Sequence, residues 1–399
     1  MSPAHPGHLD LDRLRTFVSD AYPQYLEDLR ELVNIDCGTF VPAGVNRVAD
    51  HMWDRFEASG WTVERSPSPG DVESFGDIMV ATVRGSGSRR ILLVGHMDTV
   101  FLEGTVAERP FRTEGDRVFG PGVSDMKGGL LAGLYAVSAL QECGFDDFAE
   151  ITYVCNPDEE IGSPFSRPVI KGLAADVDAC FVLEGARENG DIVSARKGVR
   201  DLRVVYHGRA AHAGVEPERG RSATLQAAHT TIALHELNGT RPGVTVNVGV
   251  IQGGTRPNVV ADRCELQVDI RAVTRADFDA MGAEAERIAW DIVVPDVTVD
   301  VESRGGFPPM EKTEATARLV ELAQGLAREL GFEVRDAATG GASDANPVAG
   351  MGVPTLDGLG PIGGADHAPG EWLDLKSVVP RTTLLAALIA SAPPRASSA

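Results

Sequence analysis

Several features that would restrict the function at once are missing from this sequence. No apolar run approaches the ~18 residues that suggest a membrane helix, so we expect no spanning segment. The N-terminal stretch lacks the basic region and the apolar core of a secretory signal. Basic residues are few, with 37 Lys and Arg against 58 Asp and Glu and a formal net charge of −21. This balance argues against nucleic acid or an anionic membrane as a partner, because both need a basic surface.

Cysteine is also scarce. The five cysteines are scattered, odd in number and contain no C-x-x-C pair. They therefore predict no disulfide framework and suit a reducing compartment. Together with the missing signal, they lead us to expect a cytoplasmic protein.

The length and the order of apolar segments predict an α/β domain. The chain has 399 residues, more than one hydrophobic core usually serves, so we expect two domains. Predicted strands alternate with helices, and several strands end in polar residues, where α/β proteins bind ligands. A Gly- and Ser-rich turn at 85–88 also predicts a hairpin between two of the strands. The expected strands are 61–66, 77–84, 90–95, 150–155 and 179–183. The expected helical segments are 9–35, which would form one or two helices, 44–59 and 128–143.

The pattern changes near residue 197. Strand, helix, strand, strand, helix and strand follow between 200 and 303, the order of a ferredoxin-like domain. The α/β pattern then resumes with helix 313–330, strands 332–336 and 353–357, and helix 376–391. We therefore expect one domain in two pieces, 1–197 and 306–399, around an inserted domain at 198–305.

The strand at 90–95 ends in His96, Met97 and Asp98. Residues two apart on a strand point to the same face, so the imidazole and the carboxylate can project together. A carboxylate that fixes the ring of a histidine is common at metal sites. An isolated His-x-Asp, however, is more often structural, and other residues must decide.

Further polar residues follow the other strands of the α/β part, and they extend the cluster. Carboxylates gathered on one rim repel one another unless cations lie among them, and imidazole with carboxylate suits zinc. The adjacent pair Glu159-Glu160 could provide one metal ligand and one general base. The full set is His96, Asp98, Asp125, Glu159, Glu160, Glu184, Asp344 and His367.

The motifs that carry these residues resemble those of the M20 family of metallopeptidases, and within it the glutamate carboxypeptidase (carboxypeptidase G2-like) branch. The resemblance covers nearly the whole chain, and the set is specific although each piece is weak. The motifs are Gly95-His-Met-Asp-Thr-Val100, Gly120-Pro-Gly-Val-Ser-Asp-Met-Lys-Gly-Gly129, Asp158-Glu-Glu-Ile-Gly162, Ala211-His-Ala-Gly214, Gly341-Ala-Ser-Asp344 and Gly364-Ala-Asp-His367.

The resemblance implies a mixed-sheet catalytic domain with two zinc ions, which Co2+ or Mn2+ could replace. It implies that Asp125 bridges the ions, that His96 and Glu184 complete one site, and that Glu160 and His367 complete the other. Glu159 would be the general base and Asp98 would orient His96. The resemblance also implies a cis peptide bond between Asp125 and Met126. Asp344, in a Gly-rich loop, would fix that loop or a partner of His367.

The inserted domain would serve as a lid and as the interface of a homodimer. In dimeric members of the family, the residue at the position of His212 enters the partner's active site and stabilises the oxyanion. Asn258 matches a lid residue that contacts substrate. Without the resemblance, His212 would be taken for a turn residue.

A substrate carboxylate needs a cation, and arginine can bind it with two hydrogen bonds. Candidates are Arg271, which fits the family best, and Arg304, with Arg256 and Arg196 as further possibilities; each could equally be a solvated surface residue. Glutamate-releasing relatives have Arg-Gly-Arg where this chain has Arg304-Gly305-Gly306. The second arginine of that motif is thus replaced by Gly306.

The sequence therefore predicts a dizinc hydrolase of an amide bond beside a free carboxylate. A carboxypeptidase releasing a glutamate-like residue and an N-acyl-amino-acid amidohydrolase both fit this chemistry. Two further alternatives are a non-catalytic homologue, which would have lost ligands, and an amidohydrolase of non-peptide C–N bonds, which Glu159-Glu160 disfavours.

Overall fold

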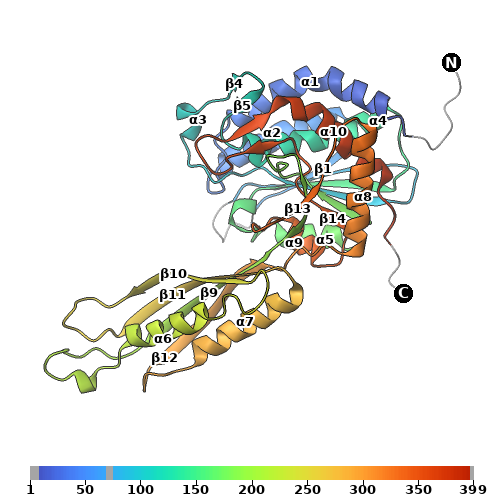
Figure 1. The fold of residues 1–399 in the computed structure, drawn as a ribbon. Helices are drawn as coiled ribbons and strands as arrows, with labels where there is room; N and C mark the ends of the chain where they lie inside the picture. Colours follow the sequence, from blue (N-terminus) through green and yellow to red (C-terminus); the bar gives the residue numbers. More distant parts are fainter. Residues whose placement is uncertain (1–8, 69–74, 396–399) are drawn as a thin grey trace, which may run out of the picture. The chain divides into compact units, whose positions relative to one another are not determined.

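The computed structural model describes residues 9–68 and 75–395, which form two compact units (Figure 1). The first unit comprises Met1–Ser194, Lys312–Ala338 and Ser343–Ala399, and the second comprises Ala195–Glu311 and Thr339–Ala342. Within the described residues, no helix is long and apolar enough to cross a membrane.

The first unit is built on a six-stranded mixed sheet in the order β1-β2-β6-β3-β7-β14. The last four strands in this order are parallel, and β1 and β2 are antiparallel to their neighbours. β3, β6 and β7 are almost wholly buried, as expected of parallel strands covered on both faces. The strands are β1 (Thr62–Ser66), β2 (Ile78–Arg84), β3 (Arg90–His96), β6 (Glu150–Asn156), β7 (Ala179–Val182) and β14 (Thr355–Leu356).

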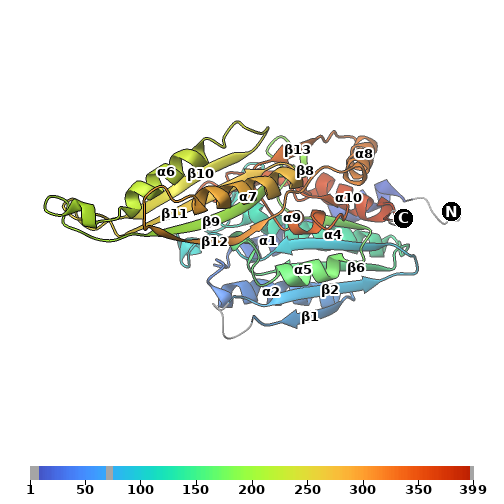
Figure 2. The same cartoon turned by 90° about the horizontal axis from the view of Figure 1, so that it is seen from below.

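The predicted hairpin between β2 and β3 is wrong, because β6 lies between these two strands. Figure 2 shows β6 beside β2. The turn after β2 exists, but its amides bond to the segment before β6. Gly85 donates to the carbonyl of Ala149, and Ser86 to that of Asp146. Local turn residues indicated a reversal of the chain but not which strand would fill the gap.

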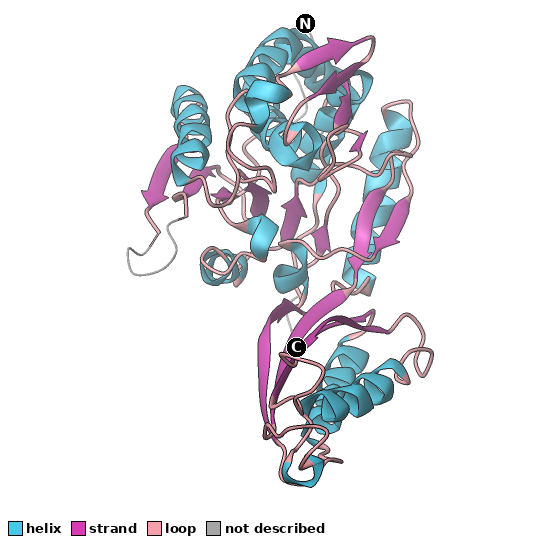
Figure 3. Ribbon diagram, turned by 90° about the vertical axis from the view of Figure 1, so that its left-hand side faces the viewer, coloured by secondary structure: helices cyan, strands magenta, loops and turns pink. Residues whose placement is uncertain are grey.

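Helices cover both faces of the first unit's sheet, as Figure 3 shows. α1, α4 and α10 pack together, while α2 packs on β1 and β2. The α1 helix is capped by Asp10, whose side chain accepts a hydrogen bond from the amide of Arg13. The helices are α1 (Leu11–Val33), α2 (Pro42–Ala58), α4 (Gly128–Glu142), α5 (Arg167–Ala174), α8 (Glu314–Glu329), α9 (Ala345–Ala349) and α10 (Leu375–Ser391).

Several short elements lie between the longer strands and helices of the first unit. A small sheet in the order β15-β16-β5-β4 brings the segment after His96 against the segment after His367. The predicted strand 332–336 lies further along the chain, as β13. The short elements are α3 (Thr105–Glu108), β4 (Arg112–Glu114), β5 (Arg117–Phe119), β8 (Ile192–Arg196), β13 (Asp336–Thr339), β15 (Gly363–Gly364) and β16 (Trp372–Asp374).

The second unit has the predicted β-α-β-β-α-β order. Its antiparallel sheet runs β10-β11-β9-β12, and α6 and α7 lie on one face of it (Figure 1). A separate hydrophobic core forms between that face and the helices. This core includes Leu202, Val204 and Ala285. The elements are β9 (Gly198–His207), α6 (Ala223–His235), β10 (Thr245–Gly253), β11 (Arg263–Ala272), α7 (Arg275–Trp290) and β12 (Thr298–Phe307).

Candidate metal centre

Three neighbouring strands of the first unit deliver polar side chains to one edge of the sheet. His96 is the last residue of β3, Glu159 and Glu160 form a short helical turn after β6, and Glu184 follows β7. Asp125 comes from the turn before α4, where the peptide bond to Met126 is cis. Since carboxyl ends of parallel strands meet at one edge, residues distant in sequence become neighbours.

Asp125 lies between the two histidines of this cluster. One carboxylate oxygen, Oδ1, is 2.9 Å from Nε2 of His96. The other, Oδ2, is 3.0 Å from Nε2 of His367. A single carboxylate thus faces one imidazole with each oxygen, which is the arrangement expected of a ligand shared by two cations.

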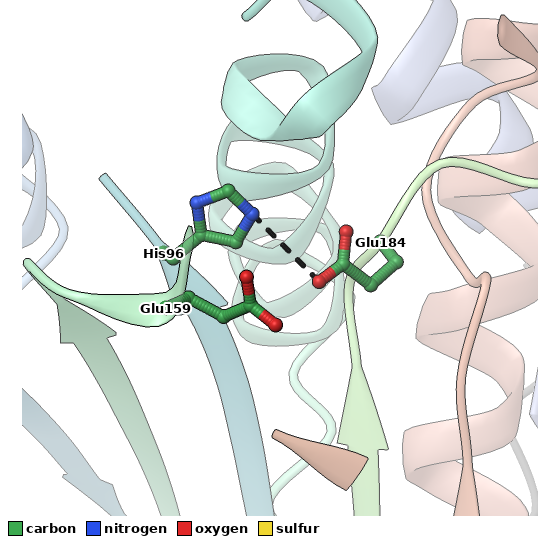
Figure 4. Close-up of side chains that lie close together, drawn as sticks. All are labelled: His96, Glu159 and Glu184. Atoms are coloured by element: carbon green, nitrogen blue, oxygen red, sulfur yellow. Dashed lines mark ion pairs between the residues drawn. The ribbon is translucent and has the colours of Figure 1, made fainter. Parts of the chain in front are cut away.

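Each histidine has a second carboxylate beside it. His96 Nε2 is 3.7 Å from Glu184 Oε1, and His367 Nε2 is 3.2 Å from Glu160 Oε2. Figure 4 shows His96, Glu159 and Glu184 pointing into one space. Potential ligand atoms of these three residues lie within 4.8 Å of one another, as do those of His96, Asp125 and Glu160. The adjacent glutamates therefore have different neighbours: Glu159 lies near Glu184, and Glu160 lies near Asp125 and His367.

Asp98 organises the residues around it. Its main-chain oxygen is 3.0 Å from Nδ1 of His96, closer than its carboxylate oxygen at 3.4 Å. The carboxylate accepts hydrogen bonds from the amides of Glu159 (3.2 Å) and Glu160 (3.3 Å) and from the hydroxyl of Thr39 (2.7 Å). Asp98 thus holds the ring of His96 through its carbonyl and the turn of the glutamates through its side chain.

The cluster is electrostatically unsatisfied without cations. Burial, and then the neighbouring Asp125, raise the pKa of Glu184 to about 8. Burial and Glu184 hold the pKa of Glu159 well above its usual range. Burial alone would raise the pKa of Asp125, but hydrogen bonds from His367 and His96 hold it well below its usual range. Such a set can ionise fully only with positive charge among it.

Glu160 provides a direct test of whether a metal fits. Its buried Oε1 has no hydrogen-bond partner within the described part of the chain. A buried carboxylate oxygen without a partner is costly, and a cation would satisfy it. Imidazole nitrogen and carboxylate oxygen are ligands that zinc accepts. The residues present therefore fit a metal centre.

Comparison with known proteins identifies the family. The model of peptidase family M20/M25/M40 matches residues 92–391. The chain belongs to peptidase family M20. The predicted family is thereby confirmed, and M20 membership makes the protein a hydrolase.

Two curated relatives show the range of activities among similar M20 chains. Carboxypeptidase G2 of Pseudomonas sp. (strain RS-16) is 33% identical over 375 residues, which cover 92% of this chain and 89% of the relative. Acetylornithine deacetylase of Myxococcus xanthus is 28% identical over 301 residues, covering 72% and 77%.

Solved structures confirm the predicted fold class. Aminopeptidase PepT from Bacillus cereus matches with a TM-score of 0.76 and 24% identity, covering 92% of this chain and 98% of that one. The M20 metallo-carboxypeptidase Sso-CP2 from Sulfolobus solfataricus matches with a TM-score of 0.71 and 16% identity, also covering 92% and 98%.

Two acidic residues near the M20 centre have roles that the sequence did not reveal. Asp344, expected in its loop or beside His367, accepts hydrogen bonds from Asn156 (2.7 Å) and Ser163 and so braces the end of β6. Burial raises its pKa to about 6. Glu371 is buried and bonds to the main chain around Asp125. No pattern separates Glu371 from an ordinary surface glutamate in the sequence.

The remaining candidate residues lie in the second unit. His212 and Asn258 are both exposed and belong to neighbouring segments, since Ala213 donates to the carbonyl of Asn258 (3.0 Å). The guanidinium of Arg271 bonds to Asp269 (3.0 Å) and to the carbonyl of Gly340 (2.7 Å). Arg304 lies in β12, and its side chain is outside the described part of the structure.

Proposed function

We propose that this protein is a dizinc hydrolase of an amide bond beside a free carboxylate. More specifically, we propose a carboxypeptidase that releases a C-terminal glutamate-like amino acid. The observation that carries the metal centre is the carboxylate of Asp125, whose two oxygens lie 2.9 and 3.0 Å from the histidines His96 and His367.

The ligands divide into two sets around Asp125. His96 and Glu184 would hold one ion, and His367 and Glu160 the other, in agreement with the histidine–glutamate distances of 3.7 and 3.2 Å. When bound, zinc would polarise the scissile carbonyl and lower the pKa of a water molecule. Asp98 keeps His96 and the two glutamates in place for this arrangement.

Glu159 is the residue proposed to move the proton. Its carboxylate lies beside His96 and Glu184, and the two ligand sets proposed above do not include it. It would take a proton from the attacking water and give it to the leaving nitrogen, so that one group acts first as base and then as acid. The amide of Glu159 bonds to Asp98, which fixes where its side chain begins.

The second unit would complete the site in a homodimer. β10 is an edge strand and exposes Val250 (41%) and Ile251 (56%), as an apolar edge available for pairing would. His212 is exposed, and Nδ1 of its ring accepts a hydrogen bond from the amide of Gly214 (3.2 Å). We propose that His212 stabilises the oxyanion in the partner's active site and that Asn258 contacts the substrate.

The substrate carboxylate would bind to Arg271, with Arg304 as a second candidate. An N-acyl-amino-acid amidohydrolase is the alternative function. Two observations favour it: the acetylornithine deacetylase of M. xanthus is 28% identical to this chain, and Gly306 stands where glutamate-releasing relatives carry a second arginine. Both reactions break the same kind of bond, and they differ in which side of it the enzyme recognises.

A release assay with zinc present separates the two functions. The panel consists of folate-type glutamates, N-acetyl amino acids and dipeptides, with Glu159→Gln protein purified in parallel as the control. The proposal predicts the highest kcat/KM for substrates with C-terminal glutamate. Preference for N-acetyl amino acids regardless of the C-terminal side chain would establish the amidohydrolase instead. Equal turnover by the Glu159→Gln control would reject the proposed base.

A further inference from the structure

Glu371 has an unusual environment for a carboxylate. Glu371 is 2% exposed. It lies after His367, in the loop that leads into β16. Oε2 accepts a hydrogen bond from the amide of Gly122 (2.9 Å), and Oε1 accepts from the amides of Ser124 (2.8 Å) and Asp125 (3.0 Å). Within the described part of the chain it has no cationic partner. The hydrogen bonds to its two oxygens therefore come from main-chain amides.

The segment that Glu371 holds is only partly supported by its own main-chain hydrogen bonds, such as those from Val123 to Gly120 (3.2 Å) and from Lys127 to Gly122 (2.9 Å). Gly122 has a left-handed conformation with φ of 71°, and Asp125 (φ −116°, ψ 90°) and Met126 (φ −134°, ψ 39°) depart from helical geometry. The amides of Gly122, Ser124 and Asp125 would lack these acceptors without Glu371. Leaving a buried main-chain donor unpaired is energetically costly. The conformation of the segment depends on the carboxylate.

The carboxylate of Glu371 also bonds to Asp125, the proposed shared ligand of the metal centre. The amide of Asp125 bonds to Glu371, while the side chain of the same residue lies between His96 and His367. Glu371 is itself held in place, because it precedes β16, which pairs with β5. Movement of Glu371 would therefore move the carboxylate of Asp125 relative to both histidines.

We propose that Glu371 is a positioning residue of the metal centre, which fixes the shared carboxylate of Asp125 by clamping the main chain of Gly122, Ser124 and Asp125. This inference rests on the metal centre proposed above. It assigns no contact between Glu371 and a metal ion. Because Asp125 is shared, loosening the clamp weakens both halves of the centre together.

The test is Glu371→Gln, which keeps the size of the side chain but replaces one acceptor oxygen by a donor. An amide NH2 facing a main-chain N–H cannot satisfy it. Removing a group that supports a metal ligand typically lowers metal affinity about 10- to 100-fold. We expect this loss in zinc titrations against a chromophoric chelator, with both equivalents weakened. The visible spectrum of the Co2+-substituted protein should change as well.

Asp28→Asn is the matched control. Asp28 is also fully buried and accepts hydrogen bonds from Gln24 (2.9 Å), Tyr135 (2.8 Å) and Arg55. It lies in α1 and bonds to none of the proposed ligands. Its substitution should lower Tm while leaving zinc affinity and the Co2+ spectrum unchanged. A fall in Tm with unchanged zinc affinity and an unchanged Co2+ spectrum thus indicates a carboxylate with a purely structural role.

The outcomes are distinct. Unchanged zinc affinity and an unchanged Co2+ spectrum in Glu371→Gln would overturn the inference while leaving the metal centre intact. A wild-type protein that binds no zinc would overturn the proposed function and the inference with it. Glu371→Asp keeps the charge but is shorter; if neither variant folds even with zinc, Glu371 is a folding determinant and the inference is wrong.

Discussion

The two units treat charge in opposite ways. The first unit buries carboxylates such as Asp98, Asp344 and Glu371 and satisfies them with amides, hydroxyls and imidazoles around one cluster. The second unit keeps its charges near the surface and pairs them with nearby opposite charges. Arg203 binds Glu265 with two hydrogen bonds of 2.8 Å, for example. Buried charge costs free energy, so several buried carboxylates gathered in one place indicate a candidate site.

The contrast shows what each unit can do alone. In the first unit, ligand atoms already lie within 4.8 Å of one another, so the proposed centre is largely preformed. In the second unit, His212 and Asn258 are exposed, and none of the charged residues whose burial is described there is buried. Their proposed roles require a surface from elsewhere. Four experiments test this contrast.

The largest effect is expected at the proposed base. Glu159→Gln removes the proton acceptor but keeps the size of the side chain, and general acid–base catalysis contributes about 10²- to 10⁴-fold. We expect kcat to fall within this range while the protein still binds two equivalents of zinc by elemental analysis. Loss of zinc together with activity would mean that Glu159 is a ligand.

The next effect is expected at His212. Removal of an oxyanion donor lowers kcat about 10²- to 10³-fold, so His212→Ala should do the same with zinc content and dimer mass unchanged. Mixed dimers of His212→Ala with Glu159→Gln test the in-trans role, because one of their two sites would be intact. Absence of any recovered activity in purified mixed dimers would contradict it, and His212→Ala mixed with itself is the control.

The third effect concerns pH. Burial raises the pKa of Glu184 to about 8, of Glu371 to about 7 and of Asp344 to about 6. The folded metal-free protein therefore binds protons that the unfolded chain releases, and its stability should fall as pH rises from about 5 to about 8. Zinc needs deprotonated ligands, so its stabilising effect should grow with pH.

Thermal unfolding of chelator-treated and zinc-saturated protein across that range measures both trends. The pKa of Asp125 is lowered, so this group remains ionised throughout and contributes nothing to the slope. A Tm of the metal-free protein that rises with pH would show that the carboxylates are paired in some other way.

The smallest effect is expected for an exposed ion pair of the second unit. Arg275 and Asp279 lie one helical turn apart with 2.8 Å between their charged groups, and their side chains are 59% and 52% exposed. Such pairs contribute about 0.3–0.5 kcal/mol. A double-mutant cycle with alanine, measured by urea unfolding, should give a coupling of that size. A coupling several times larger would end the contrast drawn between the units.

Much of the fold could be predicted from the sequence, because hydrophobic periodicity is a local signal. The β-α-β-β-α-β order of the second unit and the strand that ends at His96 both have clear patterns. The pairing of β2 had no such signal, since β6 fills the place beside it from a distant part of the chain. Strand neighbours depend on packing between segments far apart in sequence.

The proposed ligands were foreseeable for a related reason. His96, Glu160 and Glu184 follow apolar strands, where an α/β sheet places ligands. Glu371 was not foreseeable, because its importance lies in three main-chain amides of a loop near Asp125. Main-chain donors carry no sequence signature. The residues that hold a site in position are therefore harder to find than those that form it.

The order of strands at the candidate centre has one more consequence. β6, β3 and β7 are neighbours, and each delivers its donor within a few residues of its end. Adjacent strands in any sheet repeat at about 4.8 Å. The spacing of the strands thus sets the spacing of the proposed ligands, whichever side chains stand at the strand ends. Evolution can exchange the ligand residue at each strand end, but changing the distance between these positions would require a different sheet.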